Sequence, residues 1–232
     1  MHTILISGGT KGLGRAIAEY FASKGFHVAL CARTESDLQA AEQYWKDHFP
    51  NSQLLTFPAD VSKKSEIVEF AAFVRTQWEH IDVLVNNAGL FLPGLVTQEP
   101  DGTLETLIET NLYSAYYLTR GLLPLLQKGS HIFNMCSVAS TMAYPNGGAY
   151  SISKFAMFGL SKALREELKP TGVKVTALLP GATWSDSWHG VDLPYERLMQ
   201  PDDIAAMVWA AWNLSASAVV EEILIRPQLG DL

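Results

Sequence analysis

The stretch SGGTKGLG (residues 7–14) decides the fold, and it lies near the start of the chain in MHTILISGGTKGLGRAIAEYF. The β-branched and aliphatic run 3–7 predicts a strand before it, and residues 15–21 predict a helix after it. Glycines between a strand and a helix let the backbone approach a pyrophosphate, whose negative charge the helix N-terminus favours. This context predicts a dinucleotide-binding loop, with a plain strand-to-helix turn as the alternative.

The alternation of short apolar runs with longer helical patterns continues along the whole chain. We expect strands at 3–7, 27–32, 53–57, 82–86, 131–135, 174–179 and 219–225. We expect helices at 14–23, 35–48, 65–78, 101–126, 149–168 and 202–214. The strand runs are almost entirely apolar, as in parallel strands covered on both faces. The sequence therefore predicts an α/β fold with a doubly wound, Rossmann-type parallel sheet of about seven strands in three α/β/α layers.

Length and charge limit the classes of function. The chain has 232 residues, of which 48% are hydrophobic, so one domain spanning 1–232 is expected. The net charge is −7 and no run of lysine or arginine occurs, so we expect no nucleic-acid partner. Small molecules are the expected ligands.

The chain carries no pattern of export or membrane insertion. Its first residues lack a basic leader and a long apolar region, and no apolar run approaches the ~18 residues of a membrane span. Cys31 and Cys136 lie far apart in apolar, strand-like segments. Two buried, reduced thiols and a cytoplasmic location are expected.

One long segment, residues 182–200 (ATWSDSWHGVDLPYERLMQ), interrupts the alternation. It follows the end of a predicted strand, where open α/β sheets place their ligands. Long irregular segments in compact domains are often binding loops. We therefore expect a substrate lid at about 182–200.

The end of the second strand bears on the choice of dinucleotide. It contains Leu30-Cys31-Ala32-Arg33-Thr34, with no acidic residue that could hydrogen-bond a ribose diol. Arg33 offers a planar donor group suited to a phosphate, and Lys11 adds a cation in the glycine loop. NADP(H) is expected over NAD(H); two solvated surface cations are the alternative.

A tyrosine and a lysine lie four residues apart in Ala149-Tyr150-Ser151-Ile152-Ser153-Lys154, at the start of a predicted helix. Both side chains project from one helix face, where an ammonium group favours the phenolate form of a phenol. Ser137 ends a strand, so its hydroxyl can reach a ligand there. Asn111 lies within a helical pattern, although asparagine is a poor helix former.

These motifs, in this order, resemble the short-chain dehydrogenase/reductase family. Ser7 precedes Gly8, Gly12 and Gly14 in the family's Thr-Gly-x-x-x-Gly-x-Gly spacing, with serine in place of threonine. Further motifs match at fitting positions: Asp60-Val61, Asn86-Asn87-Ala88-Gly89, the quartet Asn111, Ser137, Tyr150 and Lys154, and Pro180-Gly181.

The resemblance implies a role for each matching residue. Tyr150 would be the general acid or base, Lys154 would favour the phenolate and bind the nicotinamide ribose, Ser137 would orient the carbonyl, and Asn111 would hold a water. The cofactor would contact Ser7, Gly8, Thr10, Lys11, Gly12, Leu13, Gly14, Arg33, Thr34, Asp60, Val61, Asn87, Ala88, Gly89, Tyr150, Lys154, Pro180, Gly181 and Thr183. Either Thr183 or Ser185 would hold the carboxamide. Family members are commonly homodimers or homotetramers.

The expected substrate is a small carbonyl compound or alcohol. Phe91, Tyr144, Trp184 and Trp188 are candidates for an aromatic wall suited to a ring-bearing ketone, although such rings could equally pin the lid to the core. The chain's last segment, from Val219, resembles bacterial reductases grouped with sepiapterin reductase, which suggests a pterin carbonyl. His189 has no partner at ligand spacing, so no metal is expected.

A hydrolase and a non-catalytic sensor are the two other classes of protein to compare with a reductase. A hydrolase of the nucleophile-elbow type would need a G-x-S-x-G motif, and the sequence has none. A non-catalytic NADP sensor on the same fold is the alternative, because a fold does not fix a function.

Overall fold

The computed structural model describes residues 2–185, 188 and 190–231. Its strands form one sheet in the order β3-β2-β1-β4-β5-β6-β7, with every neighbouring pair parallel. The strands are β1 (Thr3–Ser7), β2 (His27–Ala32), β3 (Leu54–Pro58), β4 (Val83–Asn86), β5 (His131–Met135), β6 (Lys174–Pro180) and β7 (Glu222–Ile225). The predicted doubly wound sheet is confirmed.

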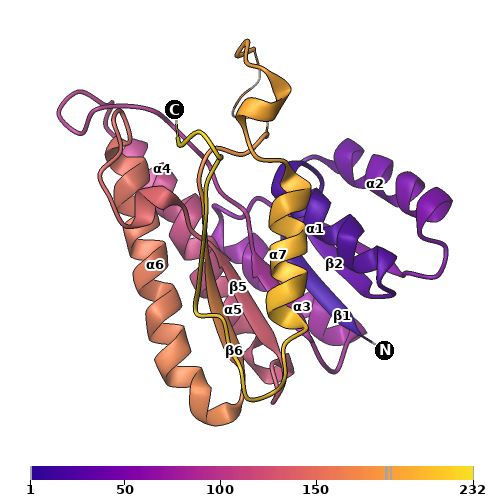
Figure 1. Ribbon diagram of the computed structural model, residues 1–232. Coiled ribbons are helices and arrows are strands. Elements are labelled where there is room, and N and C mark those ends of the chain that lie inside the picture. Colours follow the sequence, from indigo (N-terminus) through magenta and orange to yellow (C-terminus); the bar gives the residue numbers. More distant parts are fainter. Residues whose placement is uncertain (1, 186–187, 189, 232) are drawn as a thin grey trace.

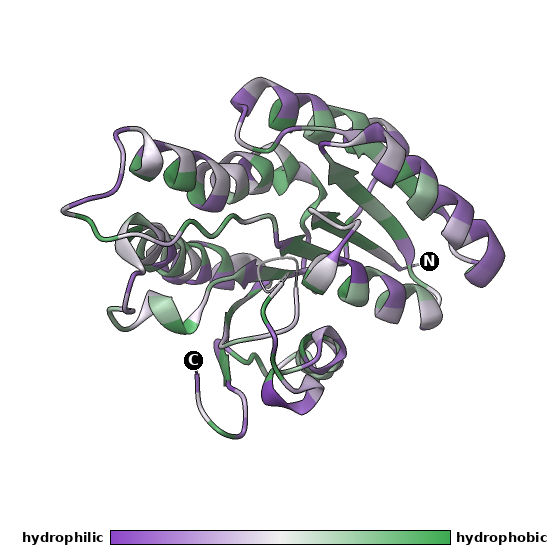
Figure 2. Ribbon diagram, turned by 90° about the horizontal axis from the view of Figure 1, so that it is seen from above, coloured by the Kyte–Doolittle hydropathy of each residue, from purple (hydrophilic) through white to green (hydrophobic). Residues whose placement is uncertain are grey.

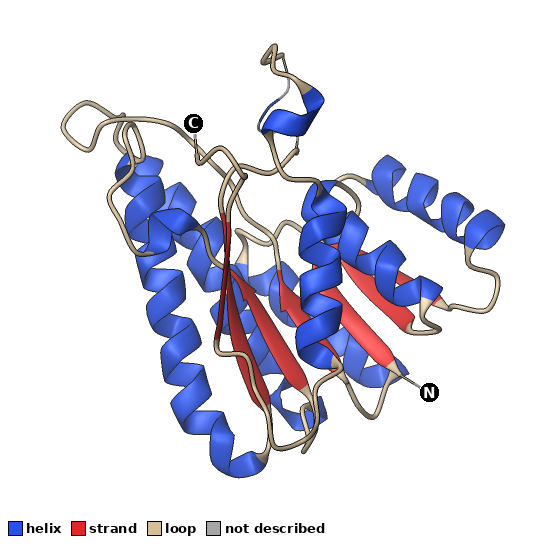
Figure 3. Ribbon diagram, in the orientation of Figure 1, coloured by secondary structure: helices blue, strands red, loops and turns tan. Residues whose placement is uncertain are grey.

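Helices cover both faces of the sheet (Figures 1 and 3). The α-helices are α1 (Gly12–Ser23), α2 (Glu35–His48), α3 (Lys64–Gln77), α4 (Thr103–Ile108), α5 (Ser114–Leu122), α6 (Gly148–Leu168) and α7 (Pro201–Trp212). Helices α1, α2 and α7 contribute to the core on one face, and α3, α5 and α6 to the core on the other. None of these described helices has the length and apolar character that crossing a membrane requires.

The two cores share the strands residue by residue. Ile4 and Ile6 of β1 pack toward α1 and α7, whereas Leu5 between them packs toward α3 and α5. All three side chains are fully buried. A strand between two helical layers needs apolar residues on both faces, which explains the unbroken apolar runs in the sequence. Figure 2 shows the hydrophobic strands between the two layers of helices.

Two predicted elements differ from the structure by more than two residues or in kind of helix. The helical pattern expected at 101–126 is divided into α4, the π-helix η1 (Glu109–Tyr113), α5 and the 3₁₀ turn η2 (Leu123–Leu125). The last strand was expected from Val219, but its pairing with β6 begins at Glu222. The Thr176 hydroxyl donates to the Val220 carbonyl. The Val220 carbonyl therefore accepts from a side chain and not from the backbone of β6.

The described residues of 182–200 rise above the carboxyl ends of the strands, where a lid is expected (Figure 1). Their described part includes the 3₁₀ turn η6 (Tyr195–Arg197) and a bridge between Thr183 and Met199. Asp186, Ser187 and His189, which belong to the expected lid, lie outside the described residues.

The two cysteines are buried and free, as expected. Burial raises the pKa of the Cys31 and Cys136 thiols to about 12. At neutral pH both side chains are therefore protonated and weakly nucleophilic.

A fully buried histidine, His131, begins β5. Its Nε2 lies 2.7 Å from Thr176 Oγ1, and its ring stacks on Phe133 at 4.0 Å between centroids. Because the Thr176 hydroxyl donates to Val220, its oxygen accepts from His131, which places the proton of the neutral imidazole on Nε2. Burial, with a smaller contribution from the charge of Lys174, lowers the pKa of His131 to about 3.

This histidine should make the protein sensitive to acid. Below about pH 6.5 His131 is protonated in the unfolded chain, but in the folded protein it stays neutral down to about pH 3. The free energy of unfolding therefore falls as the pH falls from 6.5 toward 3. The loss amounts to ~1.4 kcal/mol per pH unit. We expect His131→Gln to remove this slope in urea unfolding between pH 4.5 and 7.5. The exposed control His48→Gln should keep it, and an unchanged slope in His131→Gln would contradict the prediction.

Candidate active site

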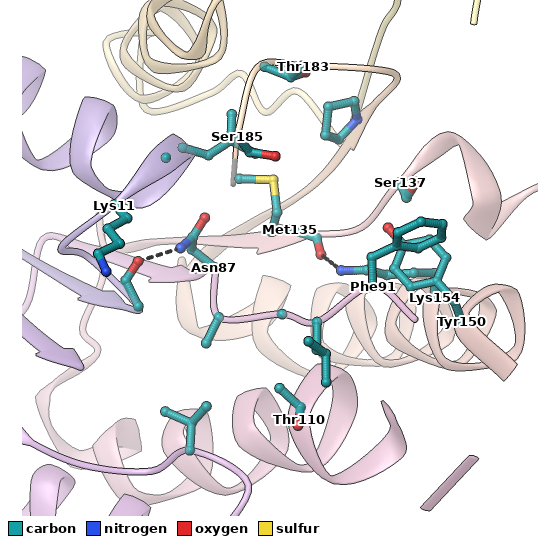
Figure 4. Close-up of a pocket in the computed structure, with 18 of the residues that line it drawn as sticks. Lys11, Asn87, Phe91, Thr110, Met135, Ser137, Tyr150, Lys154, Thr183 and Ser185 are labelled. Atoms are coloured by element: carbon teal, nitrogen blue, oxygen red, sulfur yellow. Dashed lines mark hydrogen bonds between the residues drawn. The ribbon is translucent and has the colours of Figure 1, made fainter. Parts of the chain in front are cut away.

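A cleft of about 790 Å³ opens at the carboxyl ends of the strands. It lies beside the junction of β1 and β4, where the strand order reverses: β2 and β3 lie on one side of β1, and β4 to β7 lie on the other. Such a switch point is where open α/β sheets bind ligands. Loops that follow β1 to β6 line the cleft, and Figure 4 shows how their side chains converge.

The glycine loop forms one wall of the cleft. Gly12 has a φ of +53°, in the left-handed region that favours glycine. Gly14 lies behind the wall, where an added Cβ would meet the Gly8 carbonyl oxygen at 2.2 Å and Asn87 Nδ2 at 2.5 Å. These glycines therefore shape the loop and allow Asn87 to approach it.

Ser7 and Asn87 join the ends of β1 and β4. The Ser7 hydroxyl oxygen accepts from the backbone N–H groups of Asn87 and Ala88, both at 3.1 Å. Asn87 Nδ2 donates to the carbonyls of Ser7, at 3.0 Å, and Gly8, at 2.8 Å (Figure 4). Ser7 is buried and does not line the cleft. Its hydroxyl supports the loop, and its contact with a cofactor stays a prediction.

One end of the cleft carries the cations expected to meet a phosphate. Lys11, Arg33 and Thr34 all line it, and Lys11 Nζ lies 2.9 Å from an Asp37 carboxylate oxygen. Asp37 also lines the cleft but was not predicted. Its position four residues after Arg33, in the first turn of α2, is the signal that could have found it.

Asp60 and Val61 line the same end of the cleft. Burial acts to raise the pKa of Asp60, but it is outweighed by hydrogen bonds from Ser62 and by the charges of Lys63 and Arg33, so the pKa is lowered. Asp60 Oδ1 accepts from the Ser62 N–H at 3.0 Å and from its hydroxyl at 2.8 Å. The Asp60 carboxylate, near Arg33, is thus held in place by hydrogen bonds from Ser62, two residues later in the same turn.

Tyr150 and Lys154 stand at the opposite end, on one face of α6 (Figure 4). Lys154 is 4% exposed, and its Nζ donates to the Met135 carbonyl at 2.8 Å. This ammonium group lies 5.8 Å from the centroid of the Tyr150 ring. Phe91 meets the same ring edge-on at 4.8 Å between centroids. The predicted pair therefore converges on the cleft.

Ser137 follows β5 and lies on the same side of the cleft as Tyr150 (Figure 4). It caps the 3₁₀ turn η3 (Val138–Ser140), since its Oγ accepts from the Ala139 N–H at 3.2 Å. Its backbone N–H donates to the Ser140 hydroxyl at 3.1 Å. The turn fixes Ser137 with its hydroxyl proton available to a ligand.

Asn111 belongs to η1 and lies behind the cleft wall. Its Oδ1 accepts from the Leu90 N–H at 2.7 Å, and its Nδ2 donates to the Leu90 carbonyl at 3.0 Å and the Ser153 hydroxyl at 2.9 Å. Ser153 in turn donates to the Tyr150 carbonyl at 2.7 Å. Asn111 therefore connects the loop after β4 to the helix of Tyr150. Ser153 was missed, although it is a small polar residue one turn after that tyrosine.

The loop after β6 brings Pro180, Gly181, Thr183 and Ser185 to the cleft. Thr183 is buried, and its hydroxyl donates to the Gly181 carbonyl at 3.0 Å. Ser185 lies over the glycine loop, with its Cβ 3.7 Å from the position that a Cβ on Gly12 would take. Thr183 is thus held at the end of β6, whereas Ser185 lies beside the glycine loop.

Three of the four predicted aromatic residues, Phe91, Tyr144 and Trp188, line the cleft. Trp184 does not line it, so its contact with a substrate stays a prediction. Its Nε1 donates to the Tyr195 carbonyl at 2.8 Å, and its ring stacks on that tyrosine at 6.4 Å between centroids. These contacts join two residues of the lid, whereas the alternative interpretation expected the ring to hold the lid to the core.

The remaining predicted cofactor residues, Gly8, Thr10, Leu13, Ala88 and Gly89, also line the cleft. Thr106, Glu109 and Thr110 line it as well and were missed, although they lie within five residues of the predicted Asn111. Within the described part of the chain, no cluster of histidine, cysteine or acidic residues could hold a metal ion.

Comparison with known proteins gives the same picture over nearly the whole chain. Residues 2–194 match the family model described as short chain dehydrogenase. Sepiapterin reductase of Chlorobaculum tepidum is 34% identical, with 100% of this chain and 98% of that protein covered. An NADP-dependent 3-hydroxy acid dehydrogenase of Salmonella typhi is 32% identical, with 97% of this chain and 94% of that protein covered.

A solved structure shares the fold closely. The alcohol dehydrogenase of the archaeon Thermococcus sibiricus, complexed with 5-hydroxy-NADP, superimposes with a TM-score of 0.89 and 28% identity, covering 98% of this chain and 97% of its own. The chain therefore belongs to the short-chain dehydrogenase/reductase family of oxidoreductases, which its ordered motifs resemble.

Proposed function

We propose that the protein is an NADP(H)-dependent oxidoreductase that transfers hydride between the nicotinamide and a carbonyl or secondary alcohol. The observation that carries this proposal is the convergence of Ser137, Tyr150 and Lys154 at one end of a cleft whose other end holds Lys11 (Figure 4). Arg33 lines the same cleft from the loop after β2, on the other side of β1 from β5. A cation pair and a proton donor at opposite ends suit a ligand that carries a phosphate at one end and reacts at the other.

The cleft fits a dinucleotide in its shape and polarity. Without side chains, Gly8 and Gly12 let a pyrophosphate approach the N-terminus of α1, whose dipole favours negative charge. Asp60 and Val61 would hold the adenosine part of the cofactor, and residues 87–89 would form the floor of its site. When bound, the nicotinamide donates or accepts the hydride.

The contacts of Thr183 and Ser185 suggest different partners for the two hydroxyl groups. Ser185 faces Gly12, which suits a pyrophosphate. Thr183 is held against Gly181 at the end of β6. We assign the carboxamide to Thr183 together with the backbone of Pro180 and Gly181.

Tyr150 would donate a proton to the carbonyl oxygen during reduction and take it back during oxidation. Lys154 Nζ, fixed by the Met135 carbonyl at 2.8 Å, holds a positive charge 5.8 Å from the centroid of the Tyr150 ring. Ser137 accepts from Ala139, so its own hydroxyl proton can be donated to the substrate oxygen. Asn111 would hold the loop that borders these groups and, by family resemblance, a water.

Preference for NADP(H) agrees with the relatives, one of which is named NADP-dependent and another of which was solved with 5-hydroxy-NADP. In this chain Lys11 and Arg33 would bind the 2′-phosphate. Arginine is suited to this because its planar donors can bond two phosphate oxygens together.

The substrate would be a ring-bearing ketone, since Phe91, Tyr144 and Trp188 offer an aromatic wall. The relative named sepiapterin reductase supports a pterin-like carbonyl compound. A homodimer or homotetramer in the cytoplasm remains the prediction for the whole protein. A sensor without activity is less favoured, since it would not need Tyr150, Ser137 and Lys154 together.

Replacing Tyr150 by phenylalanine should remove the proton donor and leave the cleft's shape unchanged. We expect turnover of NADPH with a panel of ring-bearing ketones to fall by about 100-fold or more, with the Kd of NADPH within twofold of wild type. The exposed Tyr195→Phe is the control and should keep its activity. A wild type that binds NADPH but oxidises it with none of the ketones would instead support a sensor.

Replacing Arg33 by alanine should weaken NADPH binding specifically. Loss of a charged hydrogen bond to a phosphate predicts a rise of about 10- to 100-fold in the Kd of NADPH and little change for NADH. Titration of both cofactors by fluorescence would measure this, with Arg75→Ala, which changes an exposed residue of α3, as the control. Equal affinities of the wild type for NADPH and NADH would refute the phosphate role.

A further inference from the structure

A carboxylate from a distant loop caps the helix that carries Tyr150. Glu99 lies between β4 and α4, and its two carboxylate oxygens accept from the backbone N–H of Ala149 at 3.2 and 3.3 Å. Ala149 directly precedes Tyr150 in the first turn of α6. The residue before α6 is Gly147, which has no side chain to cap the helix. Glu99 thus supplies from outside the acceptor and negative charge that helix N-termini favour.

The backbone around this contact is packed to admit the carboxylate. A Cβ on Gly148 would lie 2.6 Å from Glu99 Oε2 and 2.6 Å from the Gly94 carbonyl oxygen. Gly94 and Gly147 form a parallel bridge, and the Gly94 N–H donates to the Asn146 carbonyl at 2.9 Å. The loop of Glu99 and the start of α6 therefore touch through backbone, without intervening side chains.

The same loop is tied to Tyr150 from a second direction. Near its beginning, Leu90 bonds Asn111, which bonds Ser153, which donates to the Tyr150 carbonyl. Phe91 contacts the Tyr150 ring. Tyr150 is thus held through its own carbonyl on one side and through the preceding N–H on the other. Of these two attachments, only the one through Glu99 carries a charge.

We propose that Glu99 is a positioning residue for the reaction at Tyr150. It touches neither the cleft nor the reacting atoms; it fixes the first turn of α6 through Ala149, and with it the direction of the Tyr150 phenol. The part that concerns catalysis rests on the proposed function. Small displacements of a proton donor weaken catalysis strongly, by up to about 100-fold for ~1 Å, whereas cofactor binding along the remaining cleft should be unaffected.

The test compares Glu99→Ala with Glu99→Gln, whose amide oxygen can still accept from Ala149. We expect Glu99→Ala to lower kcat by about 10- to 100-fold, with the KM for the ketone and the Kd of NADPH within about twofold of wild type. Glu99→Gln should restore kcat to within about threefold. The control Glu105→Ala removes an exposed acid from the first turn of α4 and should leave kcat unchanged.

Hydrogen exchange separates this proposal from the proposed function. In Glu99→Ala the amides at the start of α6 should exchange faster, by at least about tenfold, while those at its middle keep their protection. A folded Glu99→Ala with wild-type kcat, or with unchanged exchange at Ala149, would overturn the positioning role. So would an equal weakening of kcat and of NADPH binding, which indicates general destabilisation. A wild type without turnover would refute the function, while exchange would still decide whether Glu99 holds the helix.

Discussion

The hydrogen bonds between Ser7 and the Asn87-Ala88 backbone are the constraint on which the site depends. They join the ends of β1 and β4, the two strands between which the winding of the sheet reverses. Asn87 returns two bonds to the glycine loop and thereby fixes the wall of the cleft. The chain then leaves β4 along the other wall, through Leu90 and Phe91 to Glu99. The glycine loop and the support of Tyr150 are therefore two consequences of one junction.

Much of the architecture could be predicted because its physical cause is local in sequence. A strand buried on both faces must be apolar throughout, so each parallel strand was visible as a short run, and only the last differed by several residues at its start. The glycine loop and the Tyr150–Lys154 pair were visible because their chemistry requires fixed spacings along one segment. Arg33 stood out by the absence of an acidic residue beside it.

Other features could not be predicted because they depend on contacts between distant segments. In the sequence Asp37 is only an acidic residue in the first turn of a helix, and its contact with Lys11 arises from the fold. The sequence predicts a cofactor contact for Ser7, but not that its hydroxyl oxygen accepts from backbone 80 residues away. Trp184 seemed to face the cleft, but Tyr195 offered its nitrogen a partner within the lid. Asn111 lies in a π-helix and bonds Leu90 across 21 residues of chain, and no periodicity reveals either feature.

The Ser7–Asn87 junction also bears on the order in which the protein matures during synthesis. The glycine loop emerges from the ribosome early, but its wall is completed only when β4 pairs with β1 after 80 further residues. Non-local pairings of this kind form late, because the intervening chain must first be ordered. The first βαβ unit alone would therefore be a poor nucleotide binder. Tyr150 and the loop after β6 come later still, and both line the cleft, so the cleft is complete only once β6 has been made.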